Sequence, residues 1–303
     1  MLSTARELFL EDNPLSDDNL ATRDCLEEKF FSAMCLNNGV FKKTGNGRLK
    51  DIDQALIAEL QRLGVAPKTF LDVGVSSGVS TLNWFEALQQ VGLRPSMTAT
   101  DLTMTVYLVR LFSWLHVLVE KRGFPLQYEV FGFALRPRCR IRYYPLGNGF
   151  LTTLWHILYR RVAVRSDLLK RLETLQGNLP LIDDPVIKAQ IKLVTRRLRN
   201  NKDIELLDDD ITEPTPPHLR GRFEVLRAAN ILNQGYFSPH QLSEIVRNLR
   251  DRLTGPGAFL IVVRTEKSGT NHGSILRLGD NSSFEVLTRV GGGSEIEDIV
   301  LSI

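Results

Sequence analysis

The stretch LDVGVSSGVS, residues 71–80, brings one aspartate, two glycines and three serines close together. As G-x-S-x-G, it would place Ser76 on a sharp turn between a strand and a helix, where its hydroxyl could act as a nucleophile. As D-x-G-x-S-x-G, it would form a ligand-binding loop, because Gly74 and Gly78 lack side chains that would keep a ligand away from the backbone. The two interpretations assign opposite roles to Ser76.

A serine nucleophile needs an acid and a histidine later in the chain, and its turn usually follows several strands. The first 66 residues predict helices instead, and among the five histidines only His272 stands in a suitable order, with no clear strand-end acid before it. A dinucleotide fingerprint, G-x-G-x-x-G, would need glycines where Ser76 and Val79 stand. Both alternatives are therefore weaker than the ligand-binding loop.

Acidic residues end three predicted strands: Asp72, Asp101, and either Asp209 or Asp210. The carboxyl ends of parallel strands share one edge, where open α/β sheets bind ligands. A carboxylate only accepts hydrogen bonds, so it suits an ammonium group, an amino group or a pair of hydroxyls. We expect a polar ligand carrying such groups at this edge.

Alternating elements surround these positions. A strand, a glycine-serine loop, a helix and a second strand form a βαβ unit, which predicts a mostly parallel α/β sheet with an antiparallel C-terminal strand. The predicted strands are residues 66–74, 96–103, 203–212, 222–230, 254–265, 272–279 and the start of 284–303, and the predicted helices are residues 79–92 and 238–253. Residues 1–65 are expected to form a helical N-terminal segment.

A long segment, residues 102–202, interrupts the alternation and is predicted to be a mostly helical insertion. Its expected helices are residues 104–123, 150–175 and 184–200, with a pair of strands in 126–145. Residues 105–202 contain 18 Lys or Arg and 6 Asp or Glu, a net 18 − 6 = +12, whereas the rest of the chain carries 3 − 12 = −9. The remaining parts, 66–101 and 203–303, form the expected ligand-binding domain.

Three interpretations of the insertion stay open. It could pack its own small core as a cap over the sheet. It could form an apolar substrate pocket, or a surface that meets anionic lipid through Arg and Lys. It could also bind RNA, because cations grip phosphates and aromatic rings stack on bases. Its apolar stretches are too short for a membrane span, and Arg110 interrupts the first.

The composition limits the class of protein to which the chain can belong. The chain has 303 residues, of which 43% are hydrophobic and 24% charged, as in a folded protein with a real core. Its start carries acids where a secretory signal needs a basic and then an apolar segment. The three cysteines, Cys25, Cys35 and Cys139, are far apart, which predicts neither a disulfide framework nor a metal site. We expect a cytoplasmic protein that binds no metal.

Several motifs resemble those of class I S-adenosylmethionine-dependent methyltransferases. FLDVGVSSGVST, TATDLT and LLDDDIT resemble the first three motifs of this class, with Ser76 where glycine is commonest. Residues 222–263 are similar to the fourth strand, the following helix and the turn into the fifth strand, with Ala258 in place of the second glycine. The segment after the fourth strand is distantly similar to the chemotaxis-receptor (CheR-type) enzymes, with Asn230 matching their asparagine and Ala229 in the arginine position.

The resemblance implies a Rossmann-like fold, S-adenosylmethionine as cofactor, and transfer of its methyl group. It places Asp72, Gly74 and Gly78 at the methionine end of the cofactor, with Ser76 as a hydrogen-bond donor. It also implies a set of residues for the rest of the cofactor: Asp101 and Leu102 at the ribose, Asp210 and Ile211 at the adenine, and Asn230 beneath the sulfonium.

The cofactor carries the reactivity in such enzymes, so the sequence assigns no catalytic residue. Tyr236, His240 and His272 are expected to be structural. An N-P-P-Y-like motif is absent after the fourth strand, where NILNQGYF stands, and this favours a small, fairly apolar acceptor held under residues 102–202. The alternatives are a non-catalytic S-adenosylmethionine-binding regulator, an RNA or protein methyltransferase, and a serine hydrolase that uses Ser76.

Overall fold

A computed structural model describes residues 3–10, 20–34, 36, 42, 45–135, 146–165, 167–174 and 184–303. The chain divides into two compact units, and each is considered by itself. The first unit comprises residues 1–43 and 105–195, and the second comprises residues 44–104 and 196–303. The helices before residue 66, predicted as one segment, are divided between the two units.

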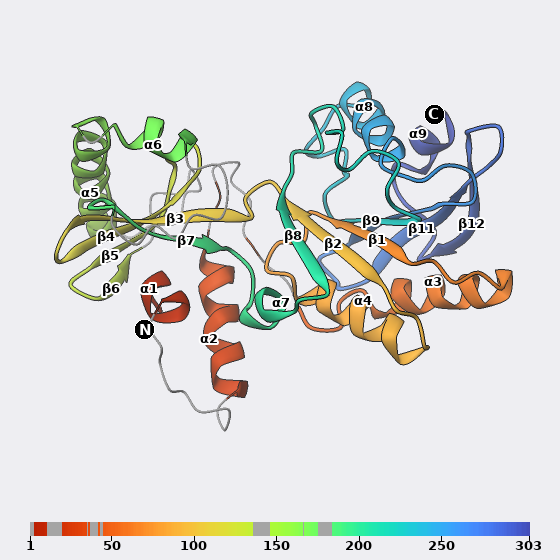
Figure 1. Cartoon of the computed structure of the whole chain (residues 1–303), viewed down its shortest axis with the longest axis horizontal. Helices are drawn as coiled ribbons and strands as arrows, with labels where there is room; N and C mark the ends of the chain where they lie inside the picture. The colour runs from red at the N-terminus through yellow and green to blue at the C-terminus, as the bar shows by residue number, and fades with distance from the viewer. Residues whose placement is uncertain are drawn as a thin grey trace. The chain divides into compact units, whose positions relative to one another are not determined.

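The second unit is built on a seven-stranded sheet in the order β12-β11-β10-β9-β1-β2-β8 (Figure 1). Its parallel strands are β1 (Thr69–Val73), β2 (Ser96–Asp101), β8 (Ile204–Asp208), β9 (Val225–Ala229) and β10 (Phe259–Thr265), and its antiparallel strands are β11 (Asn271–Leu278) and β12 (Phe284–Val290). Counted among the parallel strands alone, the order is 3-2-1-4-5, the doubly wound Rossmann-like arrangement. The predicted fold class, a mostly parallel sheet with an antiparallel C-terminal end, is confirmed.

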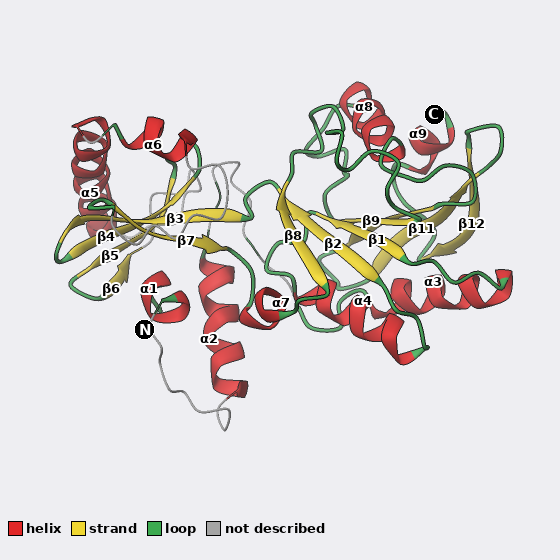
Figure 2. Ribbon diagram, in the orientation of Figure 1, coloured by secondary structure: helices red, strands yellow, loops and turns green. Residues whose placement is uncertain are grey.

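Helices cover both faces of this sheet (Figure 2). One face carries α8 (Pro239–Arg250) and α9 (Glu297–Leu301), and the other carries α3 (Lys50–Leu63) and α4 (Val79–Gln90), with α7 (Arg196–Asn200) against α4. Such two-sided cover is what a parallel sheet requires, because both of its faces are apolar.

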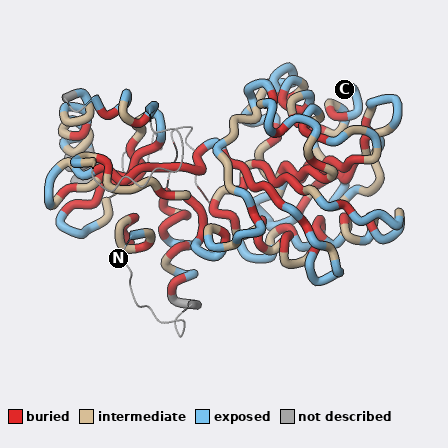
Figure 3. The backbone as a smooth tube through the Cα atoms, viewed as in Figure 1, coloured by how far each residue is buried: buried red, intermediate tan, exposed pale blue. Residues whose placement is uncertain are grey.

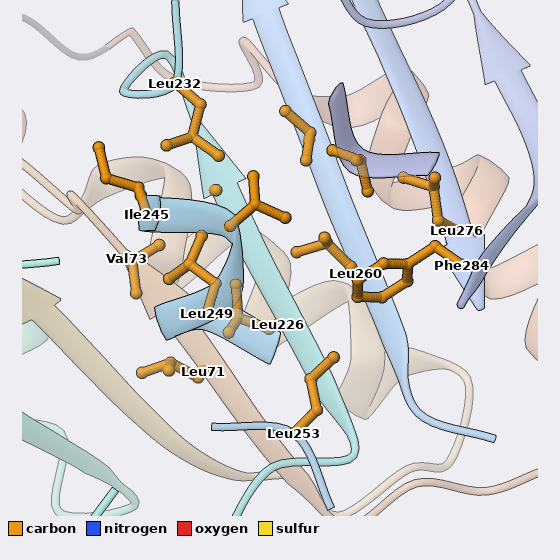
Figure 4. Packing of buried hydrophobic residues seen from close by; sticks show 14 of the residues in the cluster. Leu71, Val73, Leu226, Leu232, Ile245, Leu249, Leu253, Leu260, Leu276 and Phe284 are labelled. Carbon is orange, nitrogen blue, oxygen red and sulfur yellow. The ribbon is translucent and has the colours of Figure 1, made fainter. Parts of the chain in front are cut away.

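The core under α8 follows from strand alternation. Leu71 and Val73 of β1 point to the same face as Leu226 of β9, and these side chains pack with Ile245 and Leu249 of α8 (Figure 4). Asp72 and Arg227 alternate with these residues and so point to the opposite face, towards α3 and α4.

Two helix ends carry residues that are typical of their positions. Ser238 caps α8, its hydroxyl accepts from the backbone N–H of Gln241, and the Gln241 side chain accepts in return from the Ser238 backbone N–H. Gly64 ends α3 at φ 65°, the left-handed conformation that glycine adopts without a steric penalty.

The first unit is a five-stranded antiparallel sheet in the order β6-β5-β4-β3-β7. Its strands are β3 (Thr105–Phe112), β4 (Leu115–Glu120), β5 (Pro125–Val130), β6 (Phe133–Leu135) and β7 (Ile187–Lys192). One face packs on α1 (Ala5–Phe9) and α2 (Leu20–Ala33), and the other on α5 (Leu146–Arg165) and α6 (Leu168–Thr174). Figure 3 shows the resulting buried strands between more exposed helices.

The helix predicted over residues 104–123 is wrong, because β3 and β4 occupy this segment. The helix predicted over 184–200 is wrong in its first part, which forms β7. The insertion therefore combines a sheet with helices and is not mostly helical. Both faces of β3 and β4 are buried, so their apolar runs lack the alternation that distinguishes a strand from a helix.

No helix in the described part of the chain is long and apolar enough to cross a bilayer. No cluster of three His, Cys, Asp or Glu side chains in it could hold a metal ion. Cys25 is an exposed free thiol, and Cys35 and Cys139 lie outside the described residues.

Candidate functional site

The loop between β1 and α4, residues 74–78, lies at the carboxyl edge of the sheet. Here β1 has β2 on one side and β9 on the other, and their connections run in opposite directions. Open α/β sheets bind ligands at this switch point. The loop contains three positive φ angles: Gly74 at 71°, Ser76 at 58° and Gly78 at 83°.

Both loop glycines are also required by neighbouring side chains. A Cβ on Gly74 would lie 2.3 Å from Cγ2 of Ile231, and one on Gly78 would lie 2.1 Å from Cδ2 of Leu198. Their positive φ angles add strain for any other residue. The protein's own packing therefore accounts for both glycines, whether or not a ligand approaches them.

Asp101, at the end of β2, holds this loop in place. Its Oδ2 accepts from the backbone N–H of Ser76 at 2.7 Å, and its Oδ1 accepts from that of Thr103 at 3.1 Å. The carbonyl of Thr100 accepts from the N–H groups of Gly74 and Val75 at 2.8 and 3.1 Å. The structure thus brings together the loop and the second predicted acid. Leu102, which follows, is 50% exposed.

The two aspartates that follow β8, Asp209 and Asp210, have different roles. The carboxylate of Asp209 pairs with the fully buried Arg252, while its backbone N–H donates to the carbonyl of Asp101 at 3.1 Å. Asp210 instead caps its own turn, since Oδ1 accepts from the N–H and the hydroxyl of Thr212 at 3.0 and 2.6 Å. Ile211 packs, partly buried, against the core under α8.

Asn230 follows β9 with φ 63° and ties two strand ends together. Its Oδ1 accepts from the backbone N–H of Thr265 at 2.7 Å, and its Nδ2 donates to the hydroxyl of Thr265 at 3.4 Å. The next residue, Ile231, is the one that lies against Gly74. Asn230 is thus beside the loop, and its side-chain amide is hydrogen-bonded to Thr265 of β10.

Asp72 is buried, and its carboxylate is used inside the protein. Asp72 and Arg227 are direct neighbours on β1 and β9. Arg227 donates from Nε to Oδ1 at 3.0 Å and from Nη2 to Oδ2 at 2.6 Å, a bidentate pair. The hydroxyl of Thr81 donates to the same Oδ2 at 2.8 Å. A contact between Asp72 and a ligand's ammonium group stays a prediction, and it would require an exchange of partners.

Arg227 also binds groups from α3 and α4. Its Nη1 donates to Oδ1 of Asp53 at 2.7 Å, and its Nη2 donates to the carbonyl of Ser80 at 3.1 Å. Its Cζ lies 4.2 Å from the ring centroid of Trp84, in a cation–π contact. We call Asp53, Asp72 and Arg227 the buried ion cluster. This cluster was not predicted from the sequence, although an arginine inside the apolar strand VLRAA is an available signal.

The buried ion cluster holds two carboxylates and one guanidinium, so its negative charge is not fully balanced. Burial raises the pKa of Asp53 to about 6, against the opposing attraction of Arg227, and the charge of Asp72 adds to the rise. Burial also disfavours the charged form of Arg227, but the two carboxylates outweigh it and hold the pKa of Arg227 above its usual value.

The residues at the carboxyl edge fit the adenosine part of the implied cofactor. Asp101 is an acceptor-only group that anchors the loop, and the exposed Leu102 follows it in the chain. Asp72 is less available to the ammonium group of the methionine part, because its two oxygens already accept three hydrogen bonds within the protein.

A groove of about 810 Å³ lies at the opposite, amino edge of the same sheet. Arg94, Ser96 and Asp203 are among its lining residues, and they stand before or at the starts of β2 and β8. None of the residues that the sequence predicts for cofactor binding lines it.

No model of a known protein family and no curated protein matches the chain. Its fold is similar to several solved structures. The CMeT domain of the citrinin polyketide synthase is 14% identical over 71% of this chain and 34% of that one, with a TM-score of 0.34. The N-methyltransferase NodS from Bradyrhizobium japonicum WM9, in complex with S-adenosyl-L-homocysteine, is 11% identical over 74% and 65%, with a TM-score of 0.31.

The plantazolicin methyltransferase BpumL, also in complex with S-adenosyl-L-homocysteine, is 11% identical over 73% of this chain and 48% of that one, with a TM-score of 0.31. The chain therefore spans between about a third and two thirds of the length of these structures. Because the TM-scores are below 0.5, the similarities carry no conclusion about activity.

Replacing Arg227 by methionine should lower the free energy of unfolding by about 3–5 kcal/mol, because Asp53 and Asp72 would remain as uncompensated buried carboxylates. Urea denaturation followed by circular dichroism measures this change. Arg264→Met is the control, since Arg264 on the adjacent β10 is exposed and pairs with Glu295 at 2.6 Å. It should cost at most about 1 kcal/mol. Equal losses in both variants would contradict a dominant role for the buried ion cluster.

Asp53 should make the free energy of unfolding fall as the pH rises. Its folded pKa of about 6 exceeds its unfolded value, so its stabilising contribution is complete below about pH 4 and is lost as the pH rises through about 6. Wild type should therefore lose stability relative to Asp53→Asn between pH 4.5 and pH 7, by on the order of 1–3 kcal/mol. Asp203→Asn, at an exposed aspartate, should show no such trend. A relative gain for wild type would contradict the raised pKa.

Proposed function

We propose that the chain is an S-adenosylmethionine-dependent methyltransferase. The observation that carries the proposal is the carboxylate of Asp101, which ends β2 at the switch point of the sheet and holds the loop after β1 by the N–H of Ser76. An acid at this place, beside a loop with two positive-φ glycines, suits the ribose hydroxyls of a nucleoside.

The cofactor-binding residues would divide by chemistry. Asp101 would accept from the ribose hydroxyls, with Leu102 beside it. Asp210 and Ile211 would meet the adenine, the first through its polar turn and the second through its apolar side chain. Gly74, Ser76 and Gly78 would give the methionine part access to backbone groups.

Asp72 would act at the methionine end as a positioning residue. Its carboxylate orients Arg227, which binds the carbonyl of Ser80, and it accepts from Thr81 at the start of α4. Asp72 would therefore fix the end of the loop that leads into α4. Direct contact of Asp72 with the cofactor ammonium remains the alternative within the same proposal.

When bound, S-adenosylmethionine supplies a methyl group on a positively charged sulfonium. The chain would contribute binding and alignment, which suffice for an in-line displacement by a good nucleophile. Asn230 would lie beneath the reacting group, with its side chain fixed on Thr265. We assign no general base.

The proposed acceptor is small and fairly apolar, held by the 102–202 segment. This part of the proposal rests on the sequence: NILNQGYF stands where an N-P-P-Y-like motif would serve amide or base nitrogens. A cytoplasmic location rests on the sequence as well, because three widely separated cysteines suit a reducing compartment.

Calorimetric titration with S-adenosylmethionine and S-adenosyl-L-homocysteine tests the cofactor assignment. Asp101→Asn should weaken binding at least about tenfold, since a hydrogen bond to a charged group contributes about 1.5–3 kcal/mol. The asparagine oxygen can still accept from the N–H of Ser76, so the contact with the loop is kept, whereas the weaker contact with the N–H of Thr103 is lost. Asp203→Asn, at the amino edge, should bind like wild type. Failure of wild type to bind would overturn the cofactor, and full affinity of Asp101→Asn would overturn the role of Asp101.

The test of the two roles of Ser76 is its replacement by glycine. Ser76→Gly should keep cofactor affinity and methyl transfer to acceptors in a cell extract, and it should relieve the strain of a serine at φ 58°. A fluorophosphonate probe should leave wild type unlabelled. Labelling of wild type that disappears in Ser76→Gly would establish the hydrolase instead. Cofactor binding without any methylated product would favour a non-catalytic regulator.

A further inference from the structure

One end of the sheet in the first unit presents aromatic rings to solvent. Two hairpin turns meet there, residues 113–114 between β3 and β4 and residues 131–132 between β5 and β6. The backbone N–H of Phe131 donates to the carbonyl of Trp114 at 2.9 Å and so joins the two turns. The side chains of Phe112, Phe131 and Phe133 are 41%, 70% and 54% exposed.

These rings form a continuous stack. Trp114 lies between Phe112 and Phe131, with centroid distances of 5.4 and 5.0 Å and interplanar angles of 8° and 13°. Trp155 of α5 meets Trp114 edge-on at 5.8 Å and joins the stack to the helix. We call Phe112, Trp114, Phe131 and Phe133 the aromatic tip.

Phe131 is not explained by folding alone. Residues 131 and 132 form a two-residue hairpin turn with φ 50° and 81°, both positive. Such a turn favours Asn-Gly or Asp-Gly, because a bulky side chain at positive φ is strained. Phe131 therefore adds strain to its turn and exposes most of its ring. The stack on Trp114 offsets part of this strain. A bulky residue that is mostly exposed, in a turn that favours asparagine, points to a role outside folding.

The outer side of α5 has further exposed apolar side chains and adds positive charge. Leu154, Ile157 and Val164 are 47%, 47% and 78% exposed, and Arg160 and Arg161 are exposed between them. The sequence of α5 contains no Asp or Glu. Exposed aliphatic and aromatic side chains with only cations among them are typical of a helix that lies in a membrane interface.

The two helical faces of the first unit differ in charge. Residues 146–174, which include α5 and α6, carry 5 Lys or Arg and 2 Asp or Glu, a net 5 − 2 = +3. The described residues 3–10 and 20–34, which include α1 and α2 on the opposite face of the sheet, carry 3 Lys or Arg and 4 Asp or Glu, a net 3 − 4 = −1. An anionic surface would therefore attract the α5 side more strongly than the other.

We propose that the aromatic tip and the outer side of α5 dock the protein onto an anionic lipid bilayer. The aromatic tip would enter the headgroup region, and Arg160 and Arg161 would meet lipid phosphates. Aromatic rings and arginines would also suit single-stranded RNA. The three exposed aliphatic side chains on α5 favour lipid, because nucleic acid offers them no apolar partner. The docking would not need the methyltransferase activity.

Vesicle flotation of the full chain tests the proposal. Wild type should float with phosphatidylcholine vesicles that contain about 30% phosphatidylglycerol, and far less with phosphatidylcholine alone. Arg160→Glu with Arg161→Glu should lower the partition about tenfold or more. Arg247→Glu with Lys267→Glu, an exposed pair in the second unit, is the matched control and should leave the partition unchanged.

Phe131→Asn separates docking from folding. Asparagine suits the positive-φ turn, so this variant should unfold at an equal or higher urea concentration and yet bind anionic vesicles several-fold more weakly. Adding Phe133→Ser should weaken binding further. Tyr236→Ser, at a 60% exposed aromatic residue of the second unit, should bind like wild type.

Lipids brominated on the acyl chains give a readout that needs no variant, since they should quench the tryptophan fluorescence of wild type on anionic vesicles. Three outcomes would overturn the proposal. The first is no flotation of wild type with anionic vesicles, and the second is full vesicle binding by the Phe131→Asn, Phe133→Ser variant. The third is binding of wild type to poly(U) RNA and not to lipid, with the RNA binding weakened by the same substitutions. The last outcome would identify the surface as an RNA site.

Discussion

The buried ion cluster is the constraint on which the second unit depends. Arg227 of β9 meets Asp72 of β1 and Asp53 of α3, and it also binds the carbonyl of Ser80 at the start of α4. One guanidinium thereby connects two central strands with both helices of one face. A buried charge left without its partners is costly, so these four elements are held in one arrangement.

The candidate site is built on this arrangement. The cluster fixes the loop after β1 at its helical end, through Thr81 and Ser80, and Asp101 fixes its middle through the N–H of Ser76. The loop is thus shaped from the core on one side and from β2 on the other. Preorganised backbone groups bind a ligand with less loss of conformational freedom, which is why a rigid loop at the switch point suits cofactor binding.

The first unit uses its sheet differently. One face packs on α1 and α2 and the other on α5 and α6, so helices cover both faces of the sheet. What remains available is the end of the sheet and the outer side of α5. Several exposed apolar side chains occur there, which is typical of an interaction surface. The two units therefore divide the proposed tasks: S-adenosylmethionine binding in one and surface docking in the other.

The sequence by itself determined the mostly parallel sheet, its strand-end acids and the start of α8, because capping residues and βαβ alternation act over short distances. It also located the loop at residues 74–78. It could not separate strand from helix over residues 104–123, since both faces of β3 and β4 are buried and the apolar pattern has no period. Only the tertiary structure decided that Asp72 faces Arg227, because their pairing joins residues that are 155 positions apart and depends on which strands are neighbours.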